Sequence, residues 1–425
     1  MILLLGSLVV FLLLGIPVAY ALGLSSLLYF GVIHPELLLV LPQRVFAGLN
    51  SYAMIALPLF CLMGLIMNEA GISQRLIDFL MIFVGRLPGG LALVNVLDSM
   101  VFGGISGSSV ADVASLGTIM IPAMERKGYP KEYASGITVA TATMGMIIPP
   151  SIPMLIYAFV AQESVGRLFL AGALPGVLVG VVMFALTIGI SLWKKHPVER
   201  VGLNSKEAGR RTLAALPALL MPIFVVGSVV LGITTATESA GAGVLYAVLI
   251  GVFVYRGLKL RVLPRLLRDS IMTSASVMLI IAFSQLYIWI LAIERVPQLV
   301  AAFITGLELP VFMVLLLVDL IIIAIGTFVD VGPAIILLVP ILLPAMQSLG
   351  VSPIQFGAIM VTGLAVGLVT PPVGMCLNVA SAISGLDILR IFRGALPFIV
   401  ANIVVLTLIT LIPALSLWLP ALLMK

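Results

Sequence analysis

Long stretches without a charged residue divide this chain, and several are as long as a membrane-spanning helix. The clearest runs are 1–33, 168–192, 213–237, 239–255, 270–293 and 394–424. A helix that crosses the hydrocarbon core of a bilayer needs about 20 apolar residues. The first run has no basic start and no small-residue cleavage site, so we expect residues 1–22 to form a helix that is retained. The pattern predicts an all-α polytopic membrane protein.

Glycine and proline interrupt four other apolar segments. These segments are 91–124, 133–163, 310–346 and 354–383. Helices that break at membrane depth are tolerated only where protein buries them or where they line a polar cavity. We therefore expect these four segments to contain the functional site.

The four interrupted segments form two copies of one pattern. Pro149 and Pro150 match Pro371 and Pro372 at an offset of 222 residues, and the triplet Pro-Ala-Met at 122–124 recurs at 344–346. Apolar matches arise easily in a hydrophobic chain, whereas a proline pair and a triplet at one shared offset do not. The chain therefore contains an internal repeat.

Each copy has the same predicted layout. An apolar arm, at about 90–103 and 310–325, is too short to cross a bilayer and leads to a glycine-containing break at 102–112 and 325–334. A second arm returns to a loop, and the helix that follows is interrupted by the proline pair. This layout predicts two re-entrant helical hairpins and two Pro-Pro-broken spanning helices.

Basic residues in the loops indicate the orientation of the two copies. The loops 194–211 and 256–268 are rich in lysine and arginine, which places them in the cytoplasm. Counting spans backwards places the basic loop 126–131 on the same side, while 347–355 has no basic residue and is expected outside. The two copies are then inverted, as in secondary transporters whose binding site lies near mid-membrane.

The two predicted hairpin tips are candidate ion sites. Helix ends leave backbone carbonyl groups without partners, and a sodium ion accepts several such oxygens as ligands. Hydroxyl and carboxylate oxygens, with glycines that permit close approach, surround both tips. The candidates for sodium binding are Ser106, Gly107, Ser108, Gly326, Thr327 and Asp330. The alternative is that the small residues serve only helix packing.

The two proline pairs are candidate substrate sites. Each pair removes two amide donors and begins a half-helix, and the N-terminus of a half-helix attracts an anionic group. This feature favours a carboxylate substrate. The candidates for substrate binding are Ser109, Pro149, Pro150, Ser151, Pro371 and Pro372. The alternative is a structural kink without a ligand.

Several carboxylates lie inside apolar segments, where they are costly and usually functional. We expect Asp98 and Asp319, in the entry arms, to be paired or capping groups that fix the hairpins. Asp112 follows the first tip, and Glu238 lies at a turn between two spans, where an interfacial role is an equal alternative. Asp330 is the acid most readily assigned to a cation.

Four motifs resemble the large membrane subunit of the tripartite ATP-independent periplasmic (TRAP) transporters, part of a wider ion-transporter superfamily. They are GSSVADVASLGTIMIPAM (107–124), IIPPSIPM (147–154), GTFVDVGPAIILLVPILLPAM (326–346) and GLVTPPVGM (367–375). The resemblance implies a sodium-coupled importer with an elevator mechanism in the bacterial inner membrane, and not an enzyme. It also implies a small four-helix membrane subunit and a periplasmic substrate-binding protein. Substrates of this family are mostly organic acids, including C4-dicarboxylates and sialic acid.

The family's sodium sites map onto residues of this chain. The first maps onto Ser106 and Ser108, and the second onto the candidates at 326–330 together with Thr370. Many members have an asparagine in the span before the second proline pair, where this chain has Gly363, which offers no side-chain ligand.

An elevator requires a fixed scaffold and a moving carrier. We assign the long unbroken helices to the scaffold and the hairpins with the broken helices to the carrier. The predicted parts are scaffold 1–90, first transport core 91–165, scaffold 166–309, second transport core 310–385 and a C-terminal scaffold helix 386–425.

Other functions receive less support from the sequence. A self-sufficient carrier of the same superfamily would share the hairpins and the sodium sites. A channel is a further alternative, and an intramembrane hydrolase lacks a histidine or lysine near either predicted tip. The two cysteines and two histidines have no paired spacing, so neither a disulfide nor a transition-metal site is expected. The net charge of +5 arises from short loops and does not indicate nucleic-acid binding.

Overall fold

The chain folds into helices with large apolar outer surfaces. The computed structural model describes residues 2–50, 52–198, 205–306 and 308–424, and its regular elements there are helical. In these ranges six helices are long and apolar enough to cross a membrane, or up to eight if each of two bent pairs is one span. Leu213 and Phe253 expose 70% and 68% of their surfaces. Such exposure suits contact with lipid, so the predicted polytopic membrane fold is confirmed.

The N-terminal region differs from the prediction of one helix over 1–22. Within the described residues the first helix ends at Leu13 and the second begins at Val18. Gly15 has a φ of +79° and Pro17 precedes the second helix, so the chain turns inside an uninterrupted apolar run. The elements of this region are α1 (Ile2–Leu13), α2 (Val18–Ile33), η1 (Pro35–Val40), α3 (Leu41–Leu49), η2 (Tyr52–Ile55), α4 (Ala56–Glu69) and α5 (Ile72–Val84).

The two predicted hairpins and broken helices are present. The first copy consists of α6 (Gly90–Ser106), α7 (Ser109–Arg126), α8 (Lys131–Thr141), α9 (Met144–Ile147) and α10 (Ile152–Ala161). The second consists of α16 (Val311–Gly326), α17 (Val331–Ser348), α18 (Pro353–Leu368) and α19 (Met375–Ser384). The entry arms α6 and α16 have 17 and 16 residues, fewer than the roughly 20 that span a bilayer. Both Pro-Pro peptide bonds are cis.

The remaining helices are mostly long and unbroken. They are α11 (Val165–Trp193), α12 (Ser205–Val230), α13 (Ala236–Leu249) continued by the π-helical η3 (Ile250–Val254), η4 (Leu260–Val262), α14 (Leu263–Ile293), α15 (Val296–Gly306), α20 (Ile388–Leu411) and α21 (Ala414–Leu423). The predicted pair of spans between the two basic loops corresponds to α12 and α13. Part of the loop 194–211, including Arg200, lies outside the described residues.

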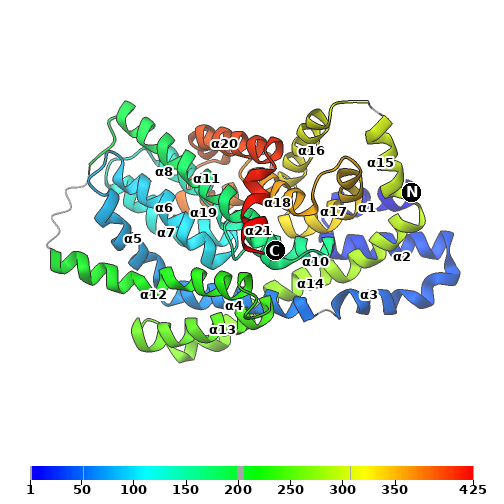
Figure 1. Cartoon of the computed structure of the whole chain (residues 1–425), viewed down its shortest axis with the longest axis horizontal. Coiled ribbons are helices and arrows are strands. Elements are labelled where there is room, and N and C mark those ends of the chain that lie inside the picture. The colour runs from blue at the N-terminus through cyan, green and yellow to red at the C-terminus, as the bar shows by residue number, and fades with distance from the viewer. Residues whose placement is uncertain (1, 51, 199–204, 307, 425) are drawn as a thin grey trace.

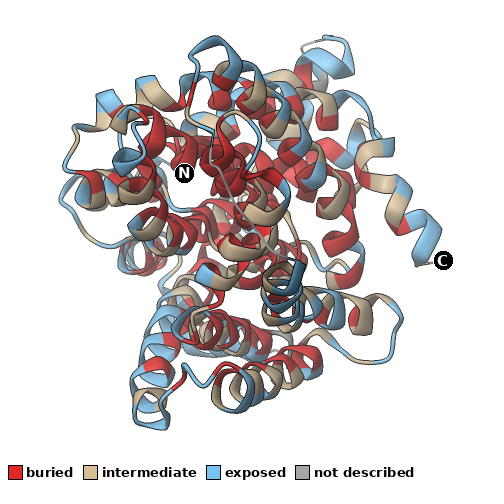
Figure 2. Ribbon diagram, turned by 90° about the vertical axis from the view of Figure 1, so that its left-hand side faces the viewer, coloured by how far each residue is buried: buried red, intermediate tan, exposed pale blue. Residues whose placement is uncertain are grey.

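Five helices outside the repeats form a long row, and the two repeats lie beside it. Figure 1 shows α12, α13, α4, α14 and α3 along one side of the molecule and the hairpins and broken helices on the other. Helix α4 packs against both α13 and α14, and α14 also packs against α2 and α3. Buried residues fill the interior, and exposed residues lie on the outer helix faces (Figure 2). The row therefore offers a wall against which the hairpin tips are placed.

Helix α20 packs against the predicted transport cores, although the sequence assigns it to the scaffold. Its main neighbours are α8 and α18. Arg390 of α20 forms an ion pair with Glu132 of α8 at 2.7 Å, and the Asn402 amide donates to Thr143 Oγ1 at 3.1 Å. The division into scaffold and carrier stays a prediction.

Candidate functional site

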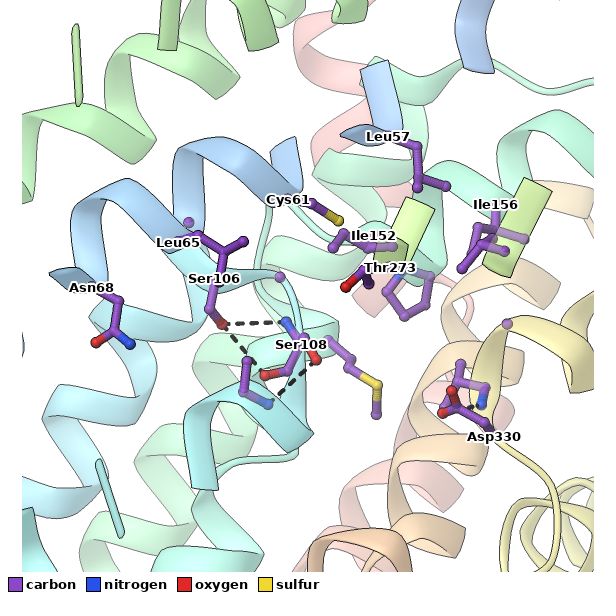
Figure 3. Close-up of a pocket in the computed structure, with 18 of the residues that line it drawn as sticks. Leu57, Cys61, Leu65, Asn68, Ser106, Ser108, Ile152, Ile156, Thr273 and Asp330 are labelled. Atoms are coloured by element: carbon purple, nitrogen blue, oxygen red, sulfur yellow. Dashed lines mark hydrogen bonds between the residues drawn. The ribbon is translucent and has the colours of Figure 1, made fainter. Parts of the chain in front are cut away.

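A cavity of about 240 Å³ lies between the two hairpin tips and the row of long helices. Its lining residues come from α4, α14, the first tip, the start of α10 and the start of α17. Figure 3 shows Ser106 and Ser108 on one side and Asp330 on the other, with Cys61 and Thr273 on the wall above them. Ser106 and Asp330 are more than 200 residues apart in the sequence, but both line this cavity.

The first tip is a turn built from glycine and serine. Helix α6 ends at Ser106, and Gly107 adopts a left-handed conformation with a φ of +64°, which glycine adopts without strain. Ser108 then caps α7 by accepting a hydrogen bond from the Ala111 amide at 3.5 Å. The Ser108 amide donates to Ser106 Oγ at 3.2 Å, and Ser106 Oγ donates to Asp112.

Asp112 is the residue at this tip that the sequence prediction left out of the site. Its side chain is fully buried, and its second carboxylate oxygen has no hydrogen-bond partner among the described residues. A buried charge without full pairing is costly, so this oxygen is a potential ligand for a cation or a site for a proton. Its position in the first turn of α7, four residues after the serine cap, is the signal that could have identified it.

The first tip is fixed against the broken helix of its own repeat. The Ile152 amide, at the start of α10, donates to the Gly107 carbonyl at 3.4 Å. A Cβ atom added at Gly103 would lie 2.7 Å from Gly145 Cα, and one added at Gly107 would lie 3.1 Å from the Pro150 carbonyl oxygen. Close backbone contact thus explains the glycines of the first break.

The second tip is also joined to its break by a backbone hydrogen bond, although its acceptor lies two residues before the position that matches Gly107. The Gly374 amide donates to the Thr327 carbonyl at 3.2 Å, and Gly374 occupies the position that matches Ile152 at the repeat offset. A Cβ atom added at Gly367 would lie 2.6 Å from Gly326. Asp330 caps α17 through a hydrogen bond from the Val331 amide to its Oδ1 atom at 2.8 Å. Each tip is therefore joined to the break of its own repeat by one backbone hydrogen bond.

The structure brings together only part of the predicted sodium set. Ser106, Gly107, Ser108 and Asp330 line the cavity, whereas the other three candidates do not. Those three are Gly326, Thr327 and Thr370, which lie where the second tip meets its break. The hydroxyls of Thr327 and Thr370 donate to helix carbonyls at 2.7 and 2.8 Å, which leaves their oxygen lone pairs free to accept.

None of the six predicted substrate residues lines the cavity in the described part of the chain. Ser151 caps α10, since its hydroxyl accepts from the Met154 amide at 3.2 Å and donates to the Met146 carbonyl. Ser109 is fully buried, Pro149 and Pro150 are buried against the first tip, and Pro372 is exposed. A role of these residues in substrate binding stays a prediction.

The other acids divide between structural and unexplained roles. Asp319 accepts a hydrogen bond from Thr410 of α20 at 2.8 Å, in line with the expected fixing role. Asp98 is buried and neither of its carboxylate oxygens has a partner among the described residues, so the expected pairing is wrong there. Glu238 forms a capping box with Thr235 at the start of α13, which is a structural role.

Two cavity residues had no signal in the sequence. Asn68 lies near the end of α4 and Thr273 lies in α14. Neither lies in a copy of the repeat, and each has another polar residue beside it, Glu69 or Ser274, so its local sequence does not single it out. Only the packing of the row of long helices against the tips places them at the site.

This combination of apolar helices and a cavity between two paired hairpins defines a polytopic membrane transporter. Residues 5–415 match the model of the family described as "Tripartite ATP-independent periplasmic transporter, DctM component". The chain belongs to this family, the one that its motifs resemble. The prediction that it is not an enzyme is also confirmed, because its relatives are named as transporter permeases.

Relatives match the chain over nearly its whole length. The C4-dicarboxylate TRAP transporter large permease protein DctM of Pseudomonas aeruginosa is 38% identical, over 94% of this chain and 93% of that protein. The sialic acid TRAP transporter large permease protein SiaM of Vibrio cholerae is 33% identical, over 96% and 95%. The isethionate TRAP transporter permease protein DctMQ of Oleidesulfovibrio alaskensis is 36% identical, over 97% of this chain and 65% of that protein.

A solved structure shares the fold. The crystal structure of the YdaH transporter of Alcanivorax borkumensis matches with a TM-score of 0.64 at 15% identity, and the match covers 97% of this chain and 98% of that chain. At this identity the likeness concerns the fold alone.

Proposed function

We propose that the chain is the membrane permease of a sodium-coupled importer of small organic acids in the bacterial inner membrane. It takes its substrate from a periplasmic binding protein, works with a small membrane subunit and moves the substrate by an elevator motion of the two repeats. The observation that carries this proposal is the cavity that Ser106, Ser108 and Asp330 share.

An anionic substrate suits this cavity because helix N-termini converge on it. The first turns of α7, α10 and α17 begin at Ser109, Ile152 and Val331, and residues at or beside these starts line the cavity. The N-terminus of a helix carries partial positive charge and free amide groups, which favour a carboxylate. No lysine, arginine or histidine lines the cavity in the described part of the chain.

The charges at the same place support sodium coupling. Asp330 brings a negative charge to the cavity, and it would repel a carboxylate substrate. A sodium ion held by Asp330 and the oxygens of the tips removes this repulsion, so that substrate binds better when the ion is present. Reciprocal dependence of the two affinities is the thermodynamic basis of coupling.

The size of the cavity favours a small acid. At about 240 Å³ it lies below the range of roughly 300–1,000 Å³ that is common for drug-sized ligands. Relatives are named for C4-dicarboxylates, isethionate and sialic acid. We favour a substrate of the size of a C4-dicarboxylate, with sialic acid as the larger alternative.

The test is uptake into proteoliposomes that contain the permease and its small subunit. A labelled organic acid is added with the binding protein, in the presence of an inward sodium gradient or an equal potassium gradient. We expect saturable uptake that needs both sodium and the binding protein. Uptake that is independent of sodium contradicts the coupling, and uptake without the binding protein identifies a self-sufficient symporter instead.

A further inference from the structure

A second cavity, of about 570 Å³, lies where the ends of α8, α11 and α20 meet. It shares no lining residue with the cavity at the hairpin tips. We call it the basic groove, and the residues that define it are Tyr133, Leu186, Ile190, Lys194, Arg390 and Arg393.

The α11 side of the basic groove changes from apolar to charged along one helix face. Leu186, Ile190 and Lys194 follow each other at intervals of four residues, so their side chains lie one above the other. The eight residues from Leu186 to Lys194 correspond to about 12 Å along the helix axis. The charge therefore lies at the helix end, and the apolar wall lies deeper in the membrane-spanning part.

The α20 side has the same polarity. Arg390 and Arg393 lie in the first two turns of α20, and Pro397 lines the groove one turn further along. Arg390 is paired with Glu132, whereas Lys194 and Arg393 are exposed and have no ion pair among the described residues. Three cations and one anion give the lining a net charge of +2.

The back of the basic groove is a fixed wall. Tyr133 is buried, and its ring centre lies 4.6 Å from that of His196. The loop after α11 is tied down because the Pro197 carbonyl accepts a hydrogen bond from the Gly89 amide at 3.1 Å. The wall is therefore in place before a ligand binds, and two cations without an ion pair in the described part of the chain lie at its charged end.

We propose that the basic groove binds an anionic phospholipid, with the phosphate held by Lys194 and Arg393 and an acyl chain along Leu186 and Ile190. A soluble phosphate would use only the charged end, and an apolar ligand would use only the wall. A phospholipid matches both. Basic pockets between membrane helices on the cytoplasmic side are suited to such headgroups, and the loops that contain these residues are predicted on that side.

The test compares lipids on the purified full-length chain in detergent. Phosphatidylglycerol and phosphatidylcholine with identical acyl chains are titrated, and bound lipid is counted by native mass spectrometry. We expect a clear preference for phosphatidylglycerol. The double variant K194Q/R393Q is expected to bind phosphatidylglycerol at least tenfold more weakly, since each basic residue near an anionic headgroup contributes to binding.

A matched control removes two other exposed cations, Lys259 and Arg261, from another loop predicted on the same side. The K259Q/R261Q variant is expected to retain the affinity of the unaltered chain. Equal binding of both lipids by the unaltered chain overturns the proposal, as does an equal loss in both double variants. Displacement of the lipid by soluble glycerol 3-phosphate at similar concentrations also overturns it, because the acyl chain would then contribute nothing.

Discussion

The two repeats differ in how the protein covers their breaks, although both join tip to break in the same way. In the first repeat Pro149, Pro150 and Ser151 are buried, and Ser151 caps the half-helix that follows. In the second repeat Pro372 and Val373 are exposed, and Gly374 at the start of α19 provides no side-chain cap. The two repeats thus share one arrangement of helices, but the break is buried in the first repeat and exposed in the second.

This difference indicates which parts of the site are fixed and which are accessible. The first tip and its break form a packed wall of the cavity between the hairpin tips, with glycine contacts that leave no space for larger residues. The second tip contributes Asp330 to the same cavity, while its break faces outward. The second break is thus the more exposed of the two.

The largest expected effect concerns Asp330, the charged cavity residue of the second tip. Asp330→Asn keeps the size and an acceptor for the Val331 amide but removes the charge. We expect sodium-driven uptake at saturating binding protein to fall at least a hundredfold, because a neutral amide is a weaker sodium ligand. Asp269→Asn, at an exposed acid paired with Arg265, is the control and should transport normally. If uptake by D330N depends on sodium as uptake by the unaltered chain does, Asp330 is not a sodium ligand.

The opposite orientation of the two copies is tested by labelling from one side of the membrane. Lys127→Cys and Gln347→Cys place a thiol near the loop of each hairpin, at positions that are exposed in the structure. In sealed vesicles of known orientation we expect an impermeant maleimide to label one of them at least tenfold faster than the other. Reversing the vesicles should reverse the preference. Labelling of both from the same side contradicts the inverted repeat.

The unequal covering of the two breaks predicts unequal reactivity. A thiol in Val373→Cys, where the native residue is 38% exposed, should react with a polar maleimide about tenfold faster than one in Ser151→Cys, at a site that is 2% exposed. The two native cysteines are buried, so the unaltered chain gives the background. Equal rates in detergent would mean that the first break opens as readily as the second.

The smallest effect concerns the cap that only the first break has. Ser151→Ala removes a helix cap, and we expect the free energy of unfolding to fall by about 1 kcal/mol. Unfolding in increasing concentrations of a denaturing detergent measures this loss. Ser276→Ala, at an exposed serine that only bonds back to the Met272 carbonyl, should change stability by less.

The hairpins were predictable because local signals mark their ends. The breaks predicted at 102–112 and 325–334 contain Gly107 and Gly326, at which the entry arms end in the structure, and the repeat offset supports each break through the other. The turn near Gly15 was missed because the hydropathy of the run does not change there. The turn becomes visible only in the structure, where Gly15 adopts a left-handed conformation. Apolar length therefore located the apolar segments but not their division into helices.

The site was predictable only where the repeat contributes to it. Ser106, Ser108 and Asp330 of the predicted tips line the cavity. Ser151 and the proline pairs, which were assigned to substrate because they are close to a break, lie outside it. Asn68 and Thr273 belong to helices outside the repeat. Their place depends on packing between distant segments, which no local pattern encodes.

The cavity is lined partly by the repeats and partly by long helices outside them. Under the proposed function, residues from the tips would hold the driving ion, while α4 and α14 supply an opposite surface that is not part of either hairpin. An exchange at Thr273 would then alter the space for the acid without touching the glycine-packed turns, whereas an exchange at Asn68 would also remove the hydrogen bond that Ser115 of α7 donates to it at 2.6 Å. On that proposal, the acid that is carried could change through the long helices while the ion site at the tips stays the same.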